Sequence, residues 1–157
     1  MPVDNLKHLA DSLRRFDLEK EQTKIIAEHK DVLADLQADQ WGELSKDYAG
    51  RDIKLLDNPG GVYRPFTIQK KRSEGRGLGS VTDRITLFQT GALYRELFVT
   101  IASGKFSLSS SVPYFKKLMN RTGDVTGLDK DHRLEFAETY VRPGVKQALK
   151  QQTGLTF

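Results

Sequence analysis

The sequence predicts an α+β fold made of two N-terminal helices, a small mainly antiparallel sheet with a β-hairpin, and a C-terminal helix. Two observations carry this prediction. Apolar residues recur every three or four positions at both ends of the chain, as in amphipathic helices. Residues 96–102 and 105–111 alternate in polarity around Ser103-Gly104, which is typical of a hairpin. The 157 residues suit a single domain, 1–157, with a helical arm at 1–45 and an α+β body at 46–157.

The N-terminal arm is expected to contain two helices. The first covers residues 4–16, where Asp4 is placed to cap the first turn. The second covers residues 19–45, and its apolar stripe runs from Ile25 to Trp41 and beyond. A helix of this length with one narrow stripe is more typical of a packing arm than of a self-contained core element.

Turn and loop signals divide the middle of the chain into short elements. The sequence Asn58-Pro59-Gly60-Gly61 predicts a turn. Thr67 is expected to cap a short helix that ends at Gly75. The glycine-rich "GRGLGS" at 75–80 predicts a flexible loop, and "RITLF" at 84–88 predicts a short strand.

Two further helices are expected after the hairpin. Pro113 suits the start of a helix over residues 112–123. The last helix is expected over residues 129–152. Pro143 lies inside it and should kink or divide it near Arg142, because proline cannot donate a main-chain hydrogen bond.

Composition limits the possible environments and partners. Hydrophobic residues make up 38% and charged residues 29%, which indicates a modest core that is completed against partners or belongs to a monomer with long solvated helices. There is no cysteine, so disulfides and thiolate sites are excluded and a reducing compartment is a natural fit. The N-terminal residues do not resemble a signal peptide, and no apolar run is long enough for a membrane span, so no membrane partner is expected. A net charge of +4 permits contact with nucleic acid without requiring it.

Catalytic and metal-binding patterns do not assemble in this sequence. His8, His29 and His132 lie far apart, and His29 falls on an apolar helix stripe, which favours a packed histidine. The acidic segment 129–135 fails the EF-hand pattern because Arg and Leu fill its fifth and sixth positions. The loop at 75–80 lacks the Gly-Lys-Ser/Thr of a P-loop, and there is no G-x-S-x-G. We therefore predict no catalytic residues, no metal and no cofactor.

One basic cluster lies in the middle of the chain. Its six cations fall within 21 residues and are opposed by only two acids; they are Arg64, Lys70, Lys71, Arg72, Arg76 and Arg84. Three interpretations stay open at this point: a solvated loop, a contact with a partner protein, and a salt-dependent contact with the DNA backbone.

The order of these segments resembles the head–tail joining and tail-completion proteins of tailed bacteriophages, also called virion morphogenesis proteins. The resemblance covers residues 41–150 and rests on "WGELSKDY" (41–48), "PFTIQKKR" (65–72), "LFQTGALYREL" (87–97), the hairpin and "VPYFKKLMNRTG" (112–123). Its most specific element is the signature Leu87-x-x-Thr90-Gly91-x-Leu93. The segment "VRPGV" (141–145) departs from the family, which often has an Arg-Pro-aromatic segment before the last helix.

The resemblance implies a structural virion protein without catalysis, assembled in the host cytoplasm. Copies of such a protein form a homo-oligomeric ring in the neck, between the portal and adjacent connector or tail proteins, around the DNA channel. Leu87, Thr90, Gly91 and Leu93 would then be structural residues: Thr90 and Gly91 make a turn that caps a short helix, and Leu93 packs inward. The alternative is a small DNA-binding accessory protein that uses the basic 64–84 segment, and a weaker third hypothesis is a hydrolase.

Overall fold

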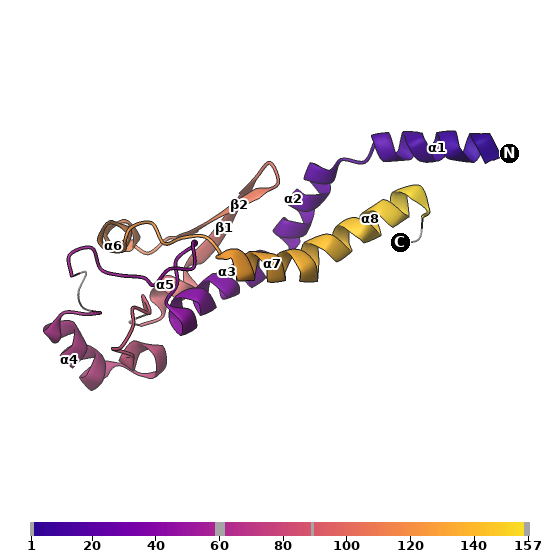
Figure 1. Cartoon of the computed structure of the whole chain (residues 1–157). Coiled ribbons are helices and arrows are strands. Elements are labelled where there is room, and N and C mark those ends of the chain that lie inside the picture. Colours follow the sequence, from indigo (N-terminus) through magenta and orange to yellow (C-terminus); the bar gives the residue numbers. More distant parts are fainter. Residues whose placement is uncertain (1, 59–61, 89, 156–157) are drawn as a thin grey trace. The chain divides into compact units, whose positions relative to one another are not determined.

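The computed structural model describes the chain except residues 1, 59–61, 89 and 156–157, and it confirms the α+β fold class (Figure 1). The chain forms two compact units. The first unit consists of Met1–His29, Ile101–Phe106 and Glu135–Phe157, and the second of Lys30–Thr100 and Ser107–Leu134. Within the described residues, every helix is too short or too polar to cross a bilayer. Most of the turn expected at 58–61 lies outside the described residues.

Helices from both ends of the chain make up most of the first unit. Helix α1 (Pro2–Arg14) and helix α2 (Leu18–Glu28) both contact the C-terminal helix α8 (Arg142–Thr153), which runs alongside them in Figure 1. Ile25 of α2 lies so close to α8 that a Cβ at Gly144 would be 2.7 Å from its Cδ1. The absence of a side chain at Gly144 therefore allows the two helices to approach closely.

Near Arg142, where a kink or a division is expected, the helix changes from α-helical to π-helical hydrogen bonding for one turn. Helix α7 (Lys130–Phe136) leads into the π-helical turn η3 (Ala137–Val141), and α8 follows without a break. The Arg142 N–H bonds to the carbonyl of Ala137, five residues earlier. Because Pro143 has no N–H, a wider turn directly before it accommodates the proline without ending the helix.

The core of the second unit is built around Trp41, which is fully buried. It lies in the π-helical turn η1 (Gln40–Leu44), which continues helix α3 (Lys30–Asp39). The surrounding core residues come from segments spread along the second unit; they are Ile53, Leu55, Ile85, Leu93, Val112 and Val125.

Polar side chains of α3 and η1 hold the segment 125–129 against this core. The indole N–H of Trp41 donates to the carbonyl of Val125 at 3.0 Å. Gln40 donates to the carbonyl of Gly127 at 3.0 Å and accepts from the N–H of Asp129 at 2.8 Å. Gln37 accepts from the N–H of Gly127 at 2.7 Å. Both glutamines are fully buried, so these bonds satisfy main-chain groups that water cannot reach.

The single helix expected over residues 19–45 is wrong. Helix α2 ends before His29, whose φ of −118° is not helical, and α3 starts at Lys30. The boundary between the two units falls at the same place, so Ile25 and Trp41 belong to different cores. The division of the chain into two units therefore differs from the expected arm at 1–45 and body at 46–157. Residues 30–45 belong to the second unit and not to an arm.

The strand expected at 84–88 is also absent: Ile85 and Thr86 are buried without being part of a sheet, and Leu87 has a φ of +53°, outside the range of a β-strand. The main-chain groups of this segment bond to side chains instead of to a neighbouring strand. The Ser45 hydroxyl donates to the carbonyl of Ile85 at 2.7 Å. The N–H of Thr86 donates to the Tyr63 hydroxyl at 3.1 Å, and the Tyr94 hydroxyl donates to the carbonyl of Thr86. These side chains take the place of the main-chain hydrogen bonds that a neighbouring strand would make.

The hairpin is confirmed. Strands β1 (Leu97–Ala102) and β2 (Lys105–Ser110) form a two-stranded antiparallel sheet. Ser103 and Gly104 join them with φ values of +48° and +67°. Two positive φ values in a two-residue loop are the geometry that matches the twist of the paired strands.

The remaining elements of the second unit are short. Helix α4 (Pro65–Glu74) begins with Arg64 as N-cap, three residues before the expected cap Thr67, because Pro65 suits the first helical position. The glycine-rich segment after it forms the 3-10 turn η2 (Gly77–Ser80) rather than a loop without regular structure. Helices α5 (Ala92–Arg95) and α6 (Phe115–Thr122) flank the hairpin in the sequence, and α6 is shorter than the expected 112–123.

Candidate functional site

The structure separates the six cations of the basic cluster into different roles. Arg64 pairs with Asp57 at 2.9 Å. Lys70 lies 3.9 Å from Glu74, and Arg84 lies 3.5 Å from Asp83. Lys71 is buried. Within the part of the chain that the structure describes, Arg72 and Arg76 are the two of the six that are exposed and whose side chains have no ion-pair or hydrogen-bond partner.

Lys71 is a structural residue and not part of an exposed binding surface, contrary to its place among the binding candidates. Its side chain is 6% exposed, and its ammonium donates to the carbonyl of Phe88 at 3.0 Å and to that of Gly79 at 3.3 Å. The same ammonium lies 4.8 Å from the centre of the Tyr63 ring. Burial lowers the pKa of Lys71. The residue thus ties α4 to η2 and to the end of the 85–88 segment.

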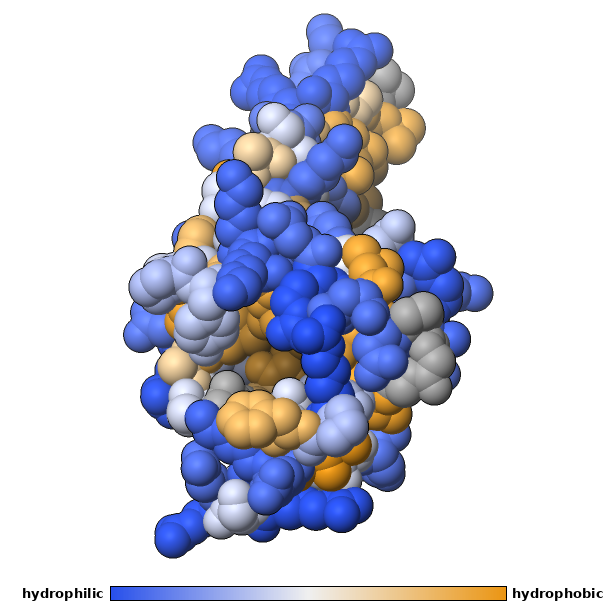
Figure 2. All heavy atoms as spheres, turned by 90° about the vertical axis from the view of Figure 1, so that its left-hand side faces the viewer, coloured by the Kyte–Doolittle hydropathy of each residue, from blue (hydrophilic) through white to orange (hydrophobic). Residues whose placement is uncertain are grey.

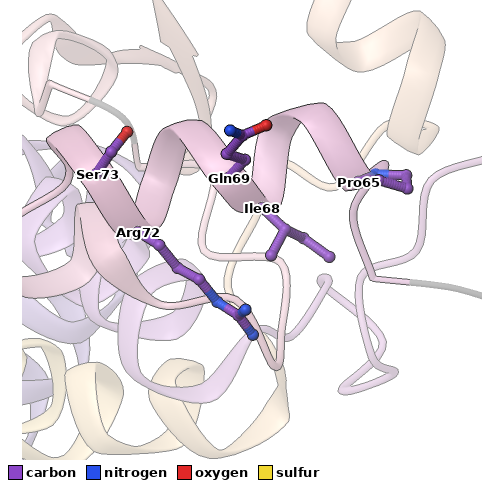
Figure 3. Close-up of a pocket in the computed structure, with 5 residues that line it drawn as sticks. All are labelled: Pro65, Ile68, Gln69, Arg72 and Ser73. Carbon is purple, nitrogen blue, oxygen red and sulfur yellow. The ribbon is translucent and has the colours of Figure 1, made fainter.

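One face of α4 borders a shallow, open groove of about 600 Å³. The residues that line it recur at helical spacing along α4; they are Pro65, Ile68, Gln69, Arg72 and Ser73. Figure 3 shows Ile68 and Arg72 extending to the same side of the helix. Figure 2 looks onto the side of the molecule that carries α4 and α6 and shows a hollow with an apolar floor among hydrophilic residues.

The groove has the chemistry of a binding surface. The guanidinium of Arg72 can hold a carboxylate or a phosphate with two parallel hydrogen bonds, beside the apolar side chain of Ile68. The Ser73 hydroxyl donates to the carbonyl of Lys70 at 3.2 Å within its own helix, so no base activates it. Among the described residues, no three His, Asp or Glu side chains gather where a metal ion could bind.

The signature at 87–93 lies in and around the core. Leu87 has a φ of +53° and packs against the core, and Leu93 is 2% exposed. Gly91, with a φ of +79°, is the N-cap of α5. The chain bends at Thr90 and Gly91 directly before α5, which agrees with a turn that caps this helix, and the cap residue is Gly91. The Thr90 carbonyl accepts from the Arg95 guanidinium at 3.2 Å.

The structure also reveals an acidic stripe that sequence reasoning missed. Asp31, Asp35, Asp39 and Glu43 follow one another at intervals of four along α3 and η1, and all are exposed. Residues 31–44 contain no Lys or Arg. The signal was present in the spacing, but only the burial of Leu33 and Gln37 on the opposite face shows that these acids share the outer face.

Comparison with protein-family models, with curated proteins and with solved structures finds no match for this chain.

Proposed function

We propose that this protein is a structural virion component that forms a homo-oligomeric ring in the head–tail connector or tail-completion complex of a tailed bacteriophage. In this role it contacts the portal or adjacent connector and tail proteins and acts without catalysis. The resemblance over residues 41–150 motivates the proposal, and the location of Leu87 and Leu93 in and around the core agrees with a structural signature.

The observation that carries the proposal is the amount of apolar surface left exposed on a small protein. Phe66 is 75% exposed and Leu56 64% exposed, and both belong to the second unit. Among the described residues the sheet has two strands, so each strand keeps one unpaired edge. Exposed apolar side chains and open strand edges favour association with further protein surfaces.

Mass photometry of the purified protein across a dilution series, followed by negative-stain electron microscopy, tests the proposal. We expect one closed species with a fixed number of copies, because a head-to-tail contact with the right rotation closes into a ring. A protein that stays monomeric at every concentration, alone and with its neighbouring virion proteins, would contradict the proposal.

A DNA-binding accessory role is the second candidate, and it draws on the unpaired Arg72 and Arg76. Measuring DNA affinity against salt separates the two roles. Six phosphate contacts would give a log–log slope of about −5, whereas two give about −2. Because Lys71 is buried and three of the other cations have acidic neighbours, we expect weak binding with the shallower slope. Tight binding with a steep slope would favour the accessory role.

A further inference from the structure

The second unit carries two exposed surfaces of opposite charge. The basic surface is the α4 groove, which Arg72 lines, together with Arg76 directly after the end of α4; neither side chain has a charged or hydrogen-bonded partner among the described residues. The acidic surface is the stripe formed by Asp31, Asp35, Asp39 and Glu43. The sequence from Asp31 to Leu44 carries four acids without a cation, so this surface is negatively charged along its whole length.

The two surfaces do not neutralise each other within one chain. Over the described residues, the ion pairs of the 64–84 segment are made with Asp57, Glu74 and Asp83, and none involves the acidic stripe. The four stripe carboxylates form no ion pair or hydrogen bond with any described side chain. Each surface is therefore available to a second molecule.

Both surfaces also place apolar side chains next to charge. Ile68 lies in the groove beside Arg72, and the neighbouring Phe66 is 75% exposed. At the end of the stripe, Leu44 follows Glu43 and is 48% exposed. Consecutive stripe acids are one helical turn apart, about 6 Å along the helix axis. Arg72 lies in the last turn of α4 and Arg76 directly after its C-cap Gly75, so both cations lie at the same end of this helix. The surfaces thus match in charge and in apolar content.

We propose that the α4 groove of one copy docks on the acidic stripe of α3 and η1 of a second copy. Arg72 and Arg76 face Asp35 and Asp39 across this contact. Because two different surfaces meet, the contact is head-to-tail, and repetition builds a ring or a filament. The inference rests on the proposed ring function and names the surface that would join its subunits.

Charge reversal tests the pairing with the full-length protein. One variant carries Arg72→Glu and Arg76→Glu, and the other carries Asp35→Lys and Asp39→Lys. Each alone places like charges across the contact, so we expect at least a tenfold weaker association by mass photometry. An equimolar mixture should recover the parental assembly, because each reversed surface then meets an oppositely charged one. Circular dichroism and thermal unfolding verify that both variants fold.

The matched control is Lys116→Glu with Lys117→Glu, which makes the same change in net charge on the exposed surface of α6. We expect this variant to assemble like the parent. Loss of assembly in the control would show that net charge, not the pairing, governs association and would overturn the inference. So would reversed variants that assemble normally, or a mixture that does not recover. If the inference fails in one of these ways but the parent protein forms rings, the proposed function still holds. If the parent protein never assembles, the proposed function and the inference are both overturned.

Discussion

The ammonium of Lys71 lies 3.0 Å from the carbonyl oxygen of Phe88, seventeen residues further along the chain. The same ammonium bonds to the carbonyl of Gly79, so one side chain joins α4, η2 and the 85–88 segment. The position of the basic face of α4 depends on this contact, because Arg72 is the next residue on the helix.

Replacement of Lys71 by Met should destabilise the second unit. The change leaves the carbonyls of Phe88 and Gly79 without their donor, which typically costs about 1–3 kcal/mol for buried groups. Urea unfolding measures the change in the free energy of unfolding. Arg72→Met is the matched control, since an exposed substitution usually changes stability by no more than about 0.5 kcal/mol. Equal effects for the two variants would contradict a structural role for Lys71.

Replacement of Gly91 by Ala should cost more than the same change at Gly50. Both glycines have positive φ values, +79° and +72°, so both variants strain the backbone by about 1–2 kcal/mol. At Gly91 the new Cβ also lies 3.0 Å from the Phe88 ring, whereas at Gly50 nothing lies within 4 Å. Thermal and urea unfolding compare the variants. If Gly91→Ala is no worse than Gly50→Ala, the contact with Phe88 has no energetic effect.

Replacement of Gly75 by Ala should disrupt the connection between α4 and η2. A Cβ at Gly75 would lie 2.3 Å from the carbonyl oxygen of Gly79 and 2.4 Å from that of Lys71. Both are main-chain atoms that cannot rotate away, so the backbone must shift at a cost of about 1–3 kcal/mol. Gly77→Ala serves as a comparison without a clash: its Cβ enters open space, and its cost comes from the positive φ of +54° instead. Hydrogen exchange at residues 71–80 measures the local loss of stability. Unchanged protection from exchange in Gly75→Ala would refute this prediction.

The pair Asp129–His132 predicts a loss of stability at low pH. Burial raises the pKa of Asp129, but hydrogen bonds from the His132 main chain and ring outweigh this effect, so the pKa lies below its usual value. A lowered carboxyl pKa contributes stability above the unfolded value of 3.8, and this contribution is lost as the pH falls through the folded value. Asp129→Asn removes the titration. We therefore expect the difference in the free energy of unfolding between the parent and Asp129→Asn to become smaller below about pH 4. A difference that is independent of pH would contradict this assignment.

The candidate site was only partly predictable from the sequence. The six cations could be found because they lie close together in the chain. Their different roles could not be predicted. The groups that surround Lys71 belong to residues 63, 79 and 88, and α4 has no apolar stripe that would mark which of its faces is buried. The acidic stripe was missed for the opposite reason: its spacing was visible, but its exposure depends on which face of α3 is buried.

The sequence by itself determined the fold class, the hairpin with its Ser103-Gly104 turn, and the approximate place of most helices. These features follow from local periodicity and from backbone conformations that particular residues favour. Only the tertiary structure decided that the helix at 19–45 divides at His29, that 84–88 forms no strand, and that Lys71 is buried. Each of these outcomes depends on partners distant in sequence, such as Ser45 for Ile85 and Tyr63 for Thr86, which satisfy main-chain groups that local patterns leave open.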